Sequence, residues 1–189
     1  MAEPLERRDV DLDALKALAH PLRQRILYHL AFAGPATSTS IAETFGESSG
    51  SASYHLRQLA RFGFIEEDAA KGNHRERWWR LVPLDLRGVT GDAIDTDEGR
   101  AARAELGRLR LERERSLLER YLANRHRFAD FDGVAMFSSS ATRLTKEELG
   151  RFTEEYVQLL KRYWRPEEQL PPDAKPIALL FYAFPWPGE

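Results

Sequence analysis

The sequence predicts an α+β fold that is mainly helical, and three observations lead to this prediction. Two short helical patterns, residues 38–45 and 48–62, follow one another and are separated by Gly46. A basic strand pair comes next within residues 64–82, and a charged pattern without proline then runs from residue 97 to residue 127. Helical and strand periodicities in this order predict an amino-terminal winged helix-turn-helix followed by a long helix.

Two further amphipathic helices are predicted upstream, within residues 11–30. His20 and Pro21 separate them, because proline disfavours helical geometry in the residue before it and suits a first helical turn. Gly34 and Pro35 follow the second of these helices and are expected to end it.

The second helix of the central pair is expected to have one apolar face and one polar face. Ala52, Leu56, Leu59 and Phe62 share the apolar face. Small hydroxyl residues at its start allow close approach to a duplex, its amino-terminal amides favour phosphate, and its arginines can reach the backbone or guanine. This pattern predicts a helix that lies in a DNA major groove. Its polar face comprises Ser49, Ser51, Ser53, Tyr54, Arg57, Gln58 and Arg61.

A strand at residues 64–67, a basic turn at residues 71–75 and a return strand at residues 75–82 predict the wing. Strand alternation places Arg75, Arg77 and Trp79 on one side and Trp78 and Arg80 on the other, an assignment that a bulge could reverse. The basic tip is expected to contact phosphate or the minor groove.

Three segments make a resemblance specific. "LKALAHPLRQRILYHL", "SASYHLRQLARFGFIE" and "KGNHRERWWRL" resemble the ArsR family of bacterial winged-helix transcriptional regulators, over about residues 9 to 83. The resemblance implies a dimeric repressor or activator whose second helix of the pair reads operator DNA. It also implies phosphate contacts by Arg23 and Arg57 and flanking contacts by the wing tip. The residues that match the base-reading or adjacent stretch of the family are Ser49, Ser51, Tyr54 and His55. A structural role for His55 is an equally open alternative.

The predicted DNA-binding set therefore joins the residues of the helix, the wing and one upstream arginine. Its members are Arg23, Ser48, Ser49, Ser51, Ser53, Tyr54, His55, Arg57, Gln58, Arg61, Lys71, Asn73, His74, Arg75 and Arg77.

The chain contains no cysteine, and this departs from the ArsR members that sense metals through thiolates. Without thiolates there is no soft site for arsenic, cadmium or copper(I), and no cysteine redox switch. The five histidines do not form repeated histidine–carboxylate pairs, and His126 is flanked by Arg125 and Arg127. We therefore expect neither a metal site nor a cofactor.

Composition limits the function further. The net charge of −2 provides no global positive field, so DNA binding must depend on a local basic surface, which argues against a sequence-blind DNA coater. Nucleophile-elbow, phosphate-loop and zinc-protease motifs are absent, so we do not expect an enzyme. The amino terminus lacks the apolar core of a signal peptide, and no apolar run approaches about 18 residues, which predicts a cytoplasmic protein without a membrane partner.

The domain organisation follows from composition. Residues 9–83 are expected to form the DNA-binding domain, residues 84–96 a linker, and residues 97–130 a long dimerisation helix. An ordinary bundle helix is the alternative, but the helix exceeds what a small domain could cover. A homodimer would place two reading helices on a two-fold axis and predicts an inverted-repeat operator in double-stranded DNA.

Residues 131–189 are predicted to form a small strand-helix-strand region for dimerisation. The strands are expected at residues 133–138 and 177–184, and the helix at residues 146–164, with Thr145 and Glu148 as a capping box. This order resembles the carboxyl-terminal extension of ArsR-like proteins from actinobacteria. The aromatic side chains here could fill a core and a dimer seam, or could line a pocket for a small-molecule effector. They are Phe128, Phe131, Phe137, Tyr156, Tyr163, Trp164, Phe181, Tyr182, Phe184 and Trp186.

These inferences predict a sequence-specific DNA-binding transcriptional regulator of ArsR type, and they favour a repressor. The alternative is a winged-helix adaptor that binds proteins. An adaptor would not need Tyr54, Arg57 and Arg61 to retain DNA, and these three residues therefore discriminate between the two functions.

Overall fold

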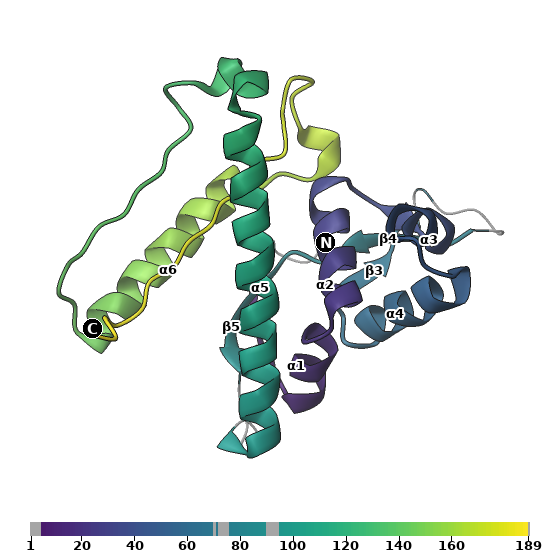
Figure 1. Ribbon diagram of the computed structural model, residues 1–189, viewed down its shortest axis with the longest axis horizontal. Coiled ribbons are helices and arrows are strands. Elements are labelled where there is room, and N and C mark those ends of the chain that lie inside the picture. Colours follow the sequence, from purple (N-terminus) through teal and green to yellow (C-terminus); the bar gives the residue numbers. More distant parts are fainter. Residues whose placement is uncertain (1–4, 70, 72–75, 90–94, 189) are drawn as a thin grey trace. The chain divides into compact units, whose positions relative to one another are not determined.

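The computed structural model describes residues 5–69, 71, 76–89 and 95–188 (Figure 1). The chain divides into two compact units, Met1–Glu112 and Arg113–Glu189, and each is described by itself. The elements in chain order are β1 (Glu6–Val10), α1 (Leu12–Leu18), α2 (Pro21–Phe32), β2 (Ala36–Thr37), α3 (Ser38–Phe45), α4 (Ser49–Arg61), β3 (Ile65–Glu67), β4 (Trp78–Leu81), β5 (Leu84–Val89), α5 (Asp97–Ala123), the 3-10 helix η2 (Arg125–Phe131), α6 (Lys146–Tyr163) and the 3-10 helix η3 (Glu167–Gln169).

Helices α1 to α4 surround one apolar core. Leu15, Ile26, Ile41, Leu56 and Leu59 are fully buried in it and come from all four helices. The predicted apolar face of α4 is confirmed, since Ala52, Leu56 and Leu59 are its buried residues. The outward face of α4 is therefore fixed by the packing of its inner face.

Local capping fixes where α3 and α4 begin and end. The Thr37 hydroxyl accepts a bond from the Ser40 amide, and the Ser40 hydroxyl accepts one from the Thr37 amide. Gly46 ends α3 in the left-handed region with φ of 69°, where a side chain is disfavoured. Ser48 then caps α4 by accepting a hydrogen bond of 3.1 Å from the Ser51 amide.

The wing is a three-stranded antiparallel sheet in the order β2-β4-β3. Glu66 pairs with Arg80 in its register, and Trp79 lies opposite Ala36. Trp79 is buried, whereas Arg80 is exposed on the opposite side, so this part of the predicted alternation is confirmed. The return strand is shorter than predicted and begins at Trp78.

A second sheet, which the sequence analysis missed, joins β1 and β5 in parallel. Residues 84–96 were predicted to be a linker, and this is wrong for β5, which occupies Leu84–Val89. Pairing with a strand 78 or 79 residues earlier supplies the hydrogen bonds that local composition does not reveal. Val10 is buried in the main core at the end of β1, so the two-stranded sheet belongs to the same folding unit.

The long helix is α5, and it ends earlier than the predicted residue 127. It runs from Asp97 to Ala123 and is followed by η2, whose Phe128 leaves helical geometry. Thr96 accepts a hydrogen bond from the Gly99 amide at the start of α5, and Asp97 and Glu98 provide acids in its first turn. The boundary between the two units falls within α5, between Glu112 and Arg113.

In the second unit, α6 has the predicted capping box. The Glu148 amide donates to the Thr145 hydroxyl at 3.1 Å, and the Thr145 amide donates to the Glu148 carboxylate at 2.8 Å. This hydrogen bonding holds the pKa of Glu148 below its ordinary value. Of the side chains of α6, Val157 is buried, whereas Phe152, Leu159 and Tyr163 are exposed.

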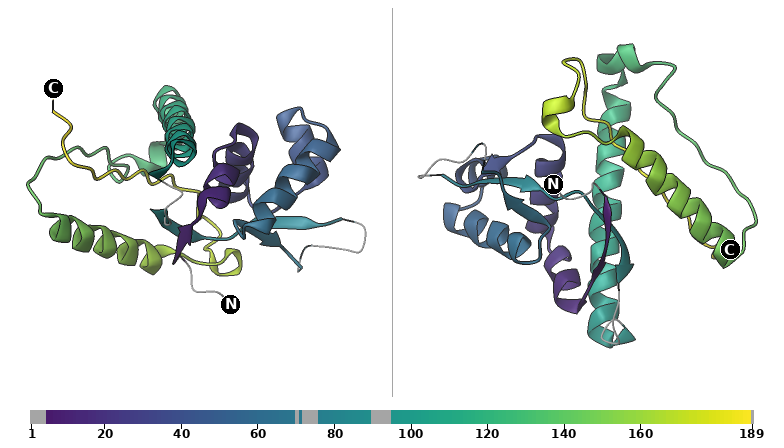
Figure 2. Two further views of the ribbon diagram at one scale, coloured as in Figure 1. Left: turned by 90° about the horizontal axis from the view of Figure 1, so that it is seen from below. Right: turned by 180° about the vertical axis from the view of Figure 1, so that it is seen from behind.

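The two strands predicted at residues 133–138 and 177–184 are wrong for the single chain. Both segments are free of strand structure, and no strand occurs among residues 113–188 (Figure 2). The physical reason is that a strand needs a ladder partner, and the two segments are held by different helices. Phe137 lies beside Tyr121 of α5 at 5.8 Å between ring centroids, whereas Phe181 stacks on Tyr156 of α6 at 4.1 Å.

No helix in the described part of the chain is long and apolar enough to cross a membrane.

Candidate nucleic-acid interface

The outward face of α4 carries the most exposed members of the predicted DNA-binding set. Tyr54 is 52% exposed although it lies on a helix with a fully buried inner face. Arg57 and Arg61 are also exposed and follow Tyr54 at intervals of three and four residues, so all three lie along one face. This face presents an aromatic ring and two guanidinium groups to solvent.

The two arginines of this face form no ion pairs within the described chain. Arg57 has no acidic partner among those residues, and Arg61 lies with its guanidinium carbon 5.4 Å from the Phe62 ring centroid. A guanidinium without an acidic neighbour can donate bidentate hydrogen bonds to phosphate or guanine. The basic character of this surface is therefore local, as the overall net charge of −2 requires.

The serines at the start of α4 have different tasks. Ser49 is exposed, whereas Ser48 serves as the cap and Ser53 is half-buried. The Ser51 hydroxyl donates to the Glu47 carboxylate at 3.1 Å, which turns it toward the preceding loop. Among these four serines, Ser49 is exposed and has a hydroxyl that is not used in the cap. Gln58, on the flank of the helix, is half-buried.

Arg23 closes the end of α1. Its guanidinium donates to the carbonyl of Ala17, and to the carbonyl of Lys16 at 3.0 Å. These carbonyls belong to the last turn of α1, where a positive charge is favourable. A phosphate contact by Arg23 would require that it share these hydrogen bonds.

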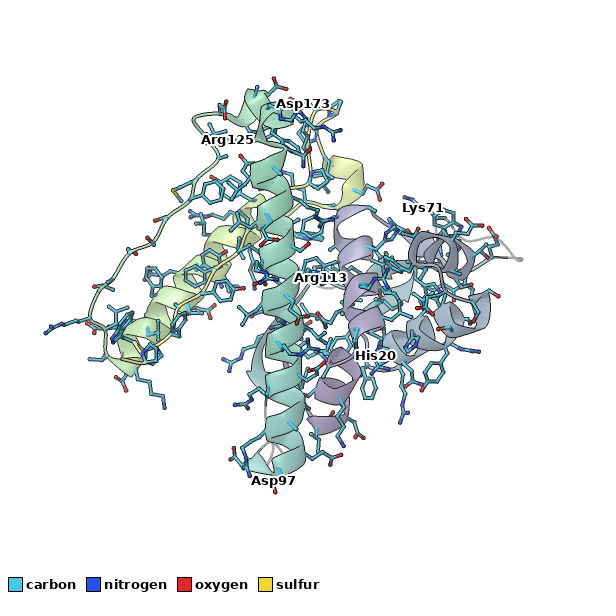
Figure 3. All side chains as sticks on the ribbon, viewed as in Figure 1. His20, Lys71, Asp97, Arg113, Arg125 and Asp173 are labelled. Atoms are coloured by element: carbon cyan, nitrogen blue, oxygen red, sulfur yellow. The ribbon has the colours of Figure 1, made fainter. Side chains whose placement is uncertain are left out.

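His55 points inward from α4 and meets His20 at the start of α2, which Figure 3 labels. The two ring centroids are 4.5 Å apart, and the Tyr54 ring lies edge-on to His55 at 5.1 Å. His20 Nδ1 accepts a hydrogen bond of 3.2 Å from the Leu22 amide and so caps α2. The arrangement favours the structural role for His55, with its ring supporting the exposed Tyr54 from behind.

The environment of this histidine pair disfavours protonation. Burial lowers the pKa of both His20 and His55 below the ordinary value, and the positive charge of Arg23 lowers each further. Glu47 acts in the opposite direction with a smaller effect. A proton on His20 Nδ1 would also remove the acceptor that caps α2.

The protein is expected to lose stability as the pH falls below about 6.5, where histidines of the unfolded chain begin to bind protons that His20 and His55 resist. Because the pKa values of the folded state are lowered, this contribution is fully present above that pH and declines below it. Chemical denaturation at about pH 7.5 and pH 5.5 should show a larger loss for the natural chain than for a His20→Asn, His55→Gln double variant. The same loss in both proteins would contradict this assignment.

The wing residues fall into two groups. Asn73, His74 and Arg75 lie outside the described residues. Lys71 and Arg77 are exposed, and the Arg77 Nε lies 3.9 Å from a Glu67 carboxylate oxygen. Such an exposed pair is weak and would yield to a phosphate at little energetic cost.

Two residues that shape the interface were missed by the sequence analysis as site residues. Glu47 orients Ser51, and His20 packs against His55. Glu47 lies before the Ser48 cap of α4, so the sequence could suggest its bond to Ser51 only through its position at the start of that helix. The contact between His20 and His55 joins residues 35 positions apart and had no local signal.

Within the ranges that the structure describes, no group of three or more histidine, aspartate or glutamate residues is placed to hold a metal ion.

Comparison with solved structures gives several weakly similar chains. YusO from Bacillus subtilis is 17% identical, with 79% of each chain covered and a TM-score of 0.34. A MarR family regulator from Neisseria meningitidis is 20% identical, with 74% of this chain and 79% of that chain covered and a TM-score of 0.32. Reduced HlyU from Vibrio cholerae is 17% identical over 49% of this chain and 80% of its own, with a TM-score of 0.32. Values as low as these carry no conclusion about this chain.

A search of curated proteins gave no match. A family model described as a helix-turn-helix domain matches residues 18–68, which contain α2, α3, α4 and β3. The packing of α3 against α4 and the caps between them agree with this match. Residues 18–68 therefore form a helix-turn-helix domain.

Proposed function

We propose that this chain is a sequence-specific DNA-binding transcriptional regulator of ArsR type that acts as a dimeric repressor. The observation that carries the proposal is the exposed row of Tyr54, Arg57 and Arg61 on α4. The opposite face of the same helix is anchored by Leu56 and Leu59, so the row is presented rigidly. The helix-turn-helix match over residues 18–68 supports the same function.

The three exposed side chains would have different roles on DNA. Tyr54 lies on the middle of α4, where its ring can make apolar and hydrogen-bonding contact with base edges in the major groove. Arg57 and Arg61 lie further toward the carboxyl end and are suited to phosphate or guanine. Lys71 and Arg77 of the wing would contact the flanking backbone.

A dimer would extend this interface to two half-sites. Two copies related by a two-fold axis place two α4 helices on successive major grooves, about one DNA turn apart, and this geometry requires an inverted-repeat operator. An effector would act by changing the separation of the two reading helices. The aromatic side chains of the second unit would be the site of such binding, if an effector exists, or the seam of the dimer.

The experiment that tests the proposal is fluorescence anisotropy of the protein on DNA from upstream of its own gene, compared with random DNA of equal length. At about 0.15 M salt, a specific reader should prefer its operator by roughly a thousandfold or more. Footprinting would then locate two half-sites in inverted orientation. Weak and equal binding to both duplexes, followed by failure to select any genomic fragment, would instead favour a protein-binding adaptor.

A further inference from the structure

Residues 177–184, near the end of the second unit, combine three properties. We name it the C-terminal segment. It is extended, and none of its residues forms a backbone–backbone hydrogen bond with the rest of the described chain. Its sequence, IALLFYAF, carries no charge, and Pro176 and Pro185 bound it. A chain with this composition and bounds is typical of the interior of a sheet.

The C-terminal segment is held to α6 by one side chain and leaves the others exposed. Phe181 stacks on Tyr156 at 4.1 Å and lies 6.0 Å from Phe152, between ring centroids, while the backbone runs along α6 (Figure 2). Tyr182 is 52% exposed and Phe184 is 68% exposed, and the following Trp186 is 81% exposed. With about 200 Å² per aromatic side chain, these three rings alone present about 400 Å² of mainly apolar surface.

Natural proteins protect exposed strand edges with charges, bulges or covering elements, because an uncharged apolar edge pairs with other chains. The nearest charged side chain before the segment is Lys175, which is held by Asp130 at 3.5 Å and lies over the Phe131 ring at 5.1 Å. Lys175 therefore places a charge only at the start of the C-terminal segment, and the rest of the segment carries none. The backbone from residue 177 to residue 184 is therefore unprotected in the same way as an uncharged strand edge, and a partner is needed to cover it.

A second copy of this chain fits the requirement of a permanent partner. The segment at residues 134–138 has the same character, since Val134, Met136 and Phe137 are exposed, and it is anchored elsewhere through Phe137 on Tyr121. Each copy therefore brings two unpaired apolar segments, one held on α5 and one held on α6, and two copies together supply four. The exposed side chains of residues 134–138 add to the about 400 Å² of the three C-terminal rings, and a standard interface uses roughly 800 Å² per partner.

We propose that the C-terminal segments of two copies pair with each other as antiparallel strands, and that this pair forms the centre of the dimer. The inference rests on the dimer of the proposed function, and it adds that the contact is a shared sheet in addition to any helix contact. A two-fold axis perpendicular to the sheet makes the two strands antiparallel and keeps both α6 helices on one face. The alternative partner, residues 134–138 of the same copy, runs in the same direction as the C-terminal segment in Figure 1 and could pair with it only in parallel.

The two-fold symmetry restricts the register of the two paired strands to a few possibilities. Directly opposed residues in antiparallel strands lie on the same face of the sheet, so one residue must face its own copy across the axis. For a segment bounded by Pro176 and Pro185, the most complete pairing places Leu180 or Phe181 at that position. Neighbouring residues point to the other face and lie about 7 Å from their own copies along the strand, with the separation growing outward.

The absence of native cysteine makes a direct test available. Single cysteines are introduced at each position from Ala178 to Ala183 in the full chain, together with Glu155→Cys on the exposed side of α6 as a matched control. After mild oxidation, the expected result is a shift from the 21.7 kDa chain to a species of twice that mass on a non-reducing gel. The shift should be strongest at position 180 or 181 and weak at the positions beside it and at 155, because a disulfide needs Cα atoms within about 7 Å.

Three outcomes would overturn the inference: a monomer by light scattering, a dimer in which no position of the segment cross-links above the control, or an intrachain disulfide in a Met136→Cys, Leu179→Cys double variant. Circular dichroism of each variant separates failed folding from failed pairing. Anisotropy on operator and random DNA is measured on the same samples. Cross-linking without DNA preference would refute the proposed regulator function but support the shared sheet. DNA preference without cross-linking would support the regulator function but refute the shared sheet.

Discussion

Replacing Leu56 by alanine is expected to lower the free energy of unfolding of the first unit by about 2–5 kcal/mol. Leu56 is fully buried on the inner face of α4 and belongs to the core that α1 to α4 share. Truncation leaves a cavity among side chains that are themselves locked by packing, so the surrounding structure cannot relax fully. The measurement is chemical denaturation followed by circular dichroism at neutral pH.

Arg57→Ala is the matched control for this prediction, because it lies on the same helix and faces solvent. Alanine is a good helix former, so the control should change stability by about 0.5 kcal/mol or less. Leu56→Ala should also weaken DNA binding only at temperatures where the variant is partly unfolded. A loss of stability below about 1 kcal/mol would mean that the apolar anchor of α4 lies elsewhere.

Tyr54→Ala is expected to reduce the preference for operator over random DNA by about 1–3 kcal/mol, which is the scale of one base contact. Tyr54 is exposed in the middle of the outward face of α4, and its ring is supported from behind by His55. Removal of the ring takes away a base contact and leaves the phosphate contacts intact. Affinity for random DNA should therefore change little.

Arg57→Ala is expected to have the complementary effect on DNA. A phosphate contact contributes to every sequence alike, so affinity should fall on both duplexes and the slope of log K against log salt should become shallower by about one unit. Anisotropy titrations of both variants across a series of salt concentrations measure the two quantities together. Equal losses on operator and random DNA for Tyr54→Ala, or an unchanged salt slope for Arg57→Ala, would contradict the assigned roles.

The helix-turn-helix was predictable because its signals are local. Capping residues, Gly46 and the spacing of Ala52, Leu56 and Leu59 lie within one or two turns of the elements that they define. The β1–β5 sheet was missed because its two strands are far apart in the sequence and its register depends on tertiary contact. The same reason explains the segments at 133–138 and 177–184, where a strand pattern was visible but the partner that would make it a strand is not in the single chain.

The outward row of the interface was predictable to a similar degree. Helical periodicity alone places Tyr54, Arg57 and Arg61 opposite the buried leucines. Periodicity could not show that Ser51 turns to Glu47 or that the Arg23 guanidinium closes α1, because side-chain partners depend on the path of the loops. The sequence therefore predicted the direction of each side chain better than whether that side chain is already held by a hydrogen bond within the protein.

The β1–β5 pairing means that the compact first unit is longer than the helix-turn-helix match at residues 18–68. A fragment cut to residues 18–68 would lose Val10 and Leu15 from its core, together with both strands of the parallel sheet. It would also lose Arg8, whose guanidinium donates to the Gly63 carbonyl just after α4. Residues on both sides of the helix-turn-helix match thus complete its core and its hydrogen bonds. A fragment limited to the matched residues would lack these contacts.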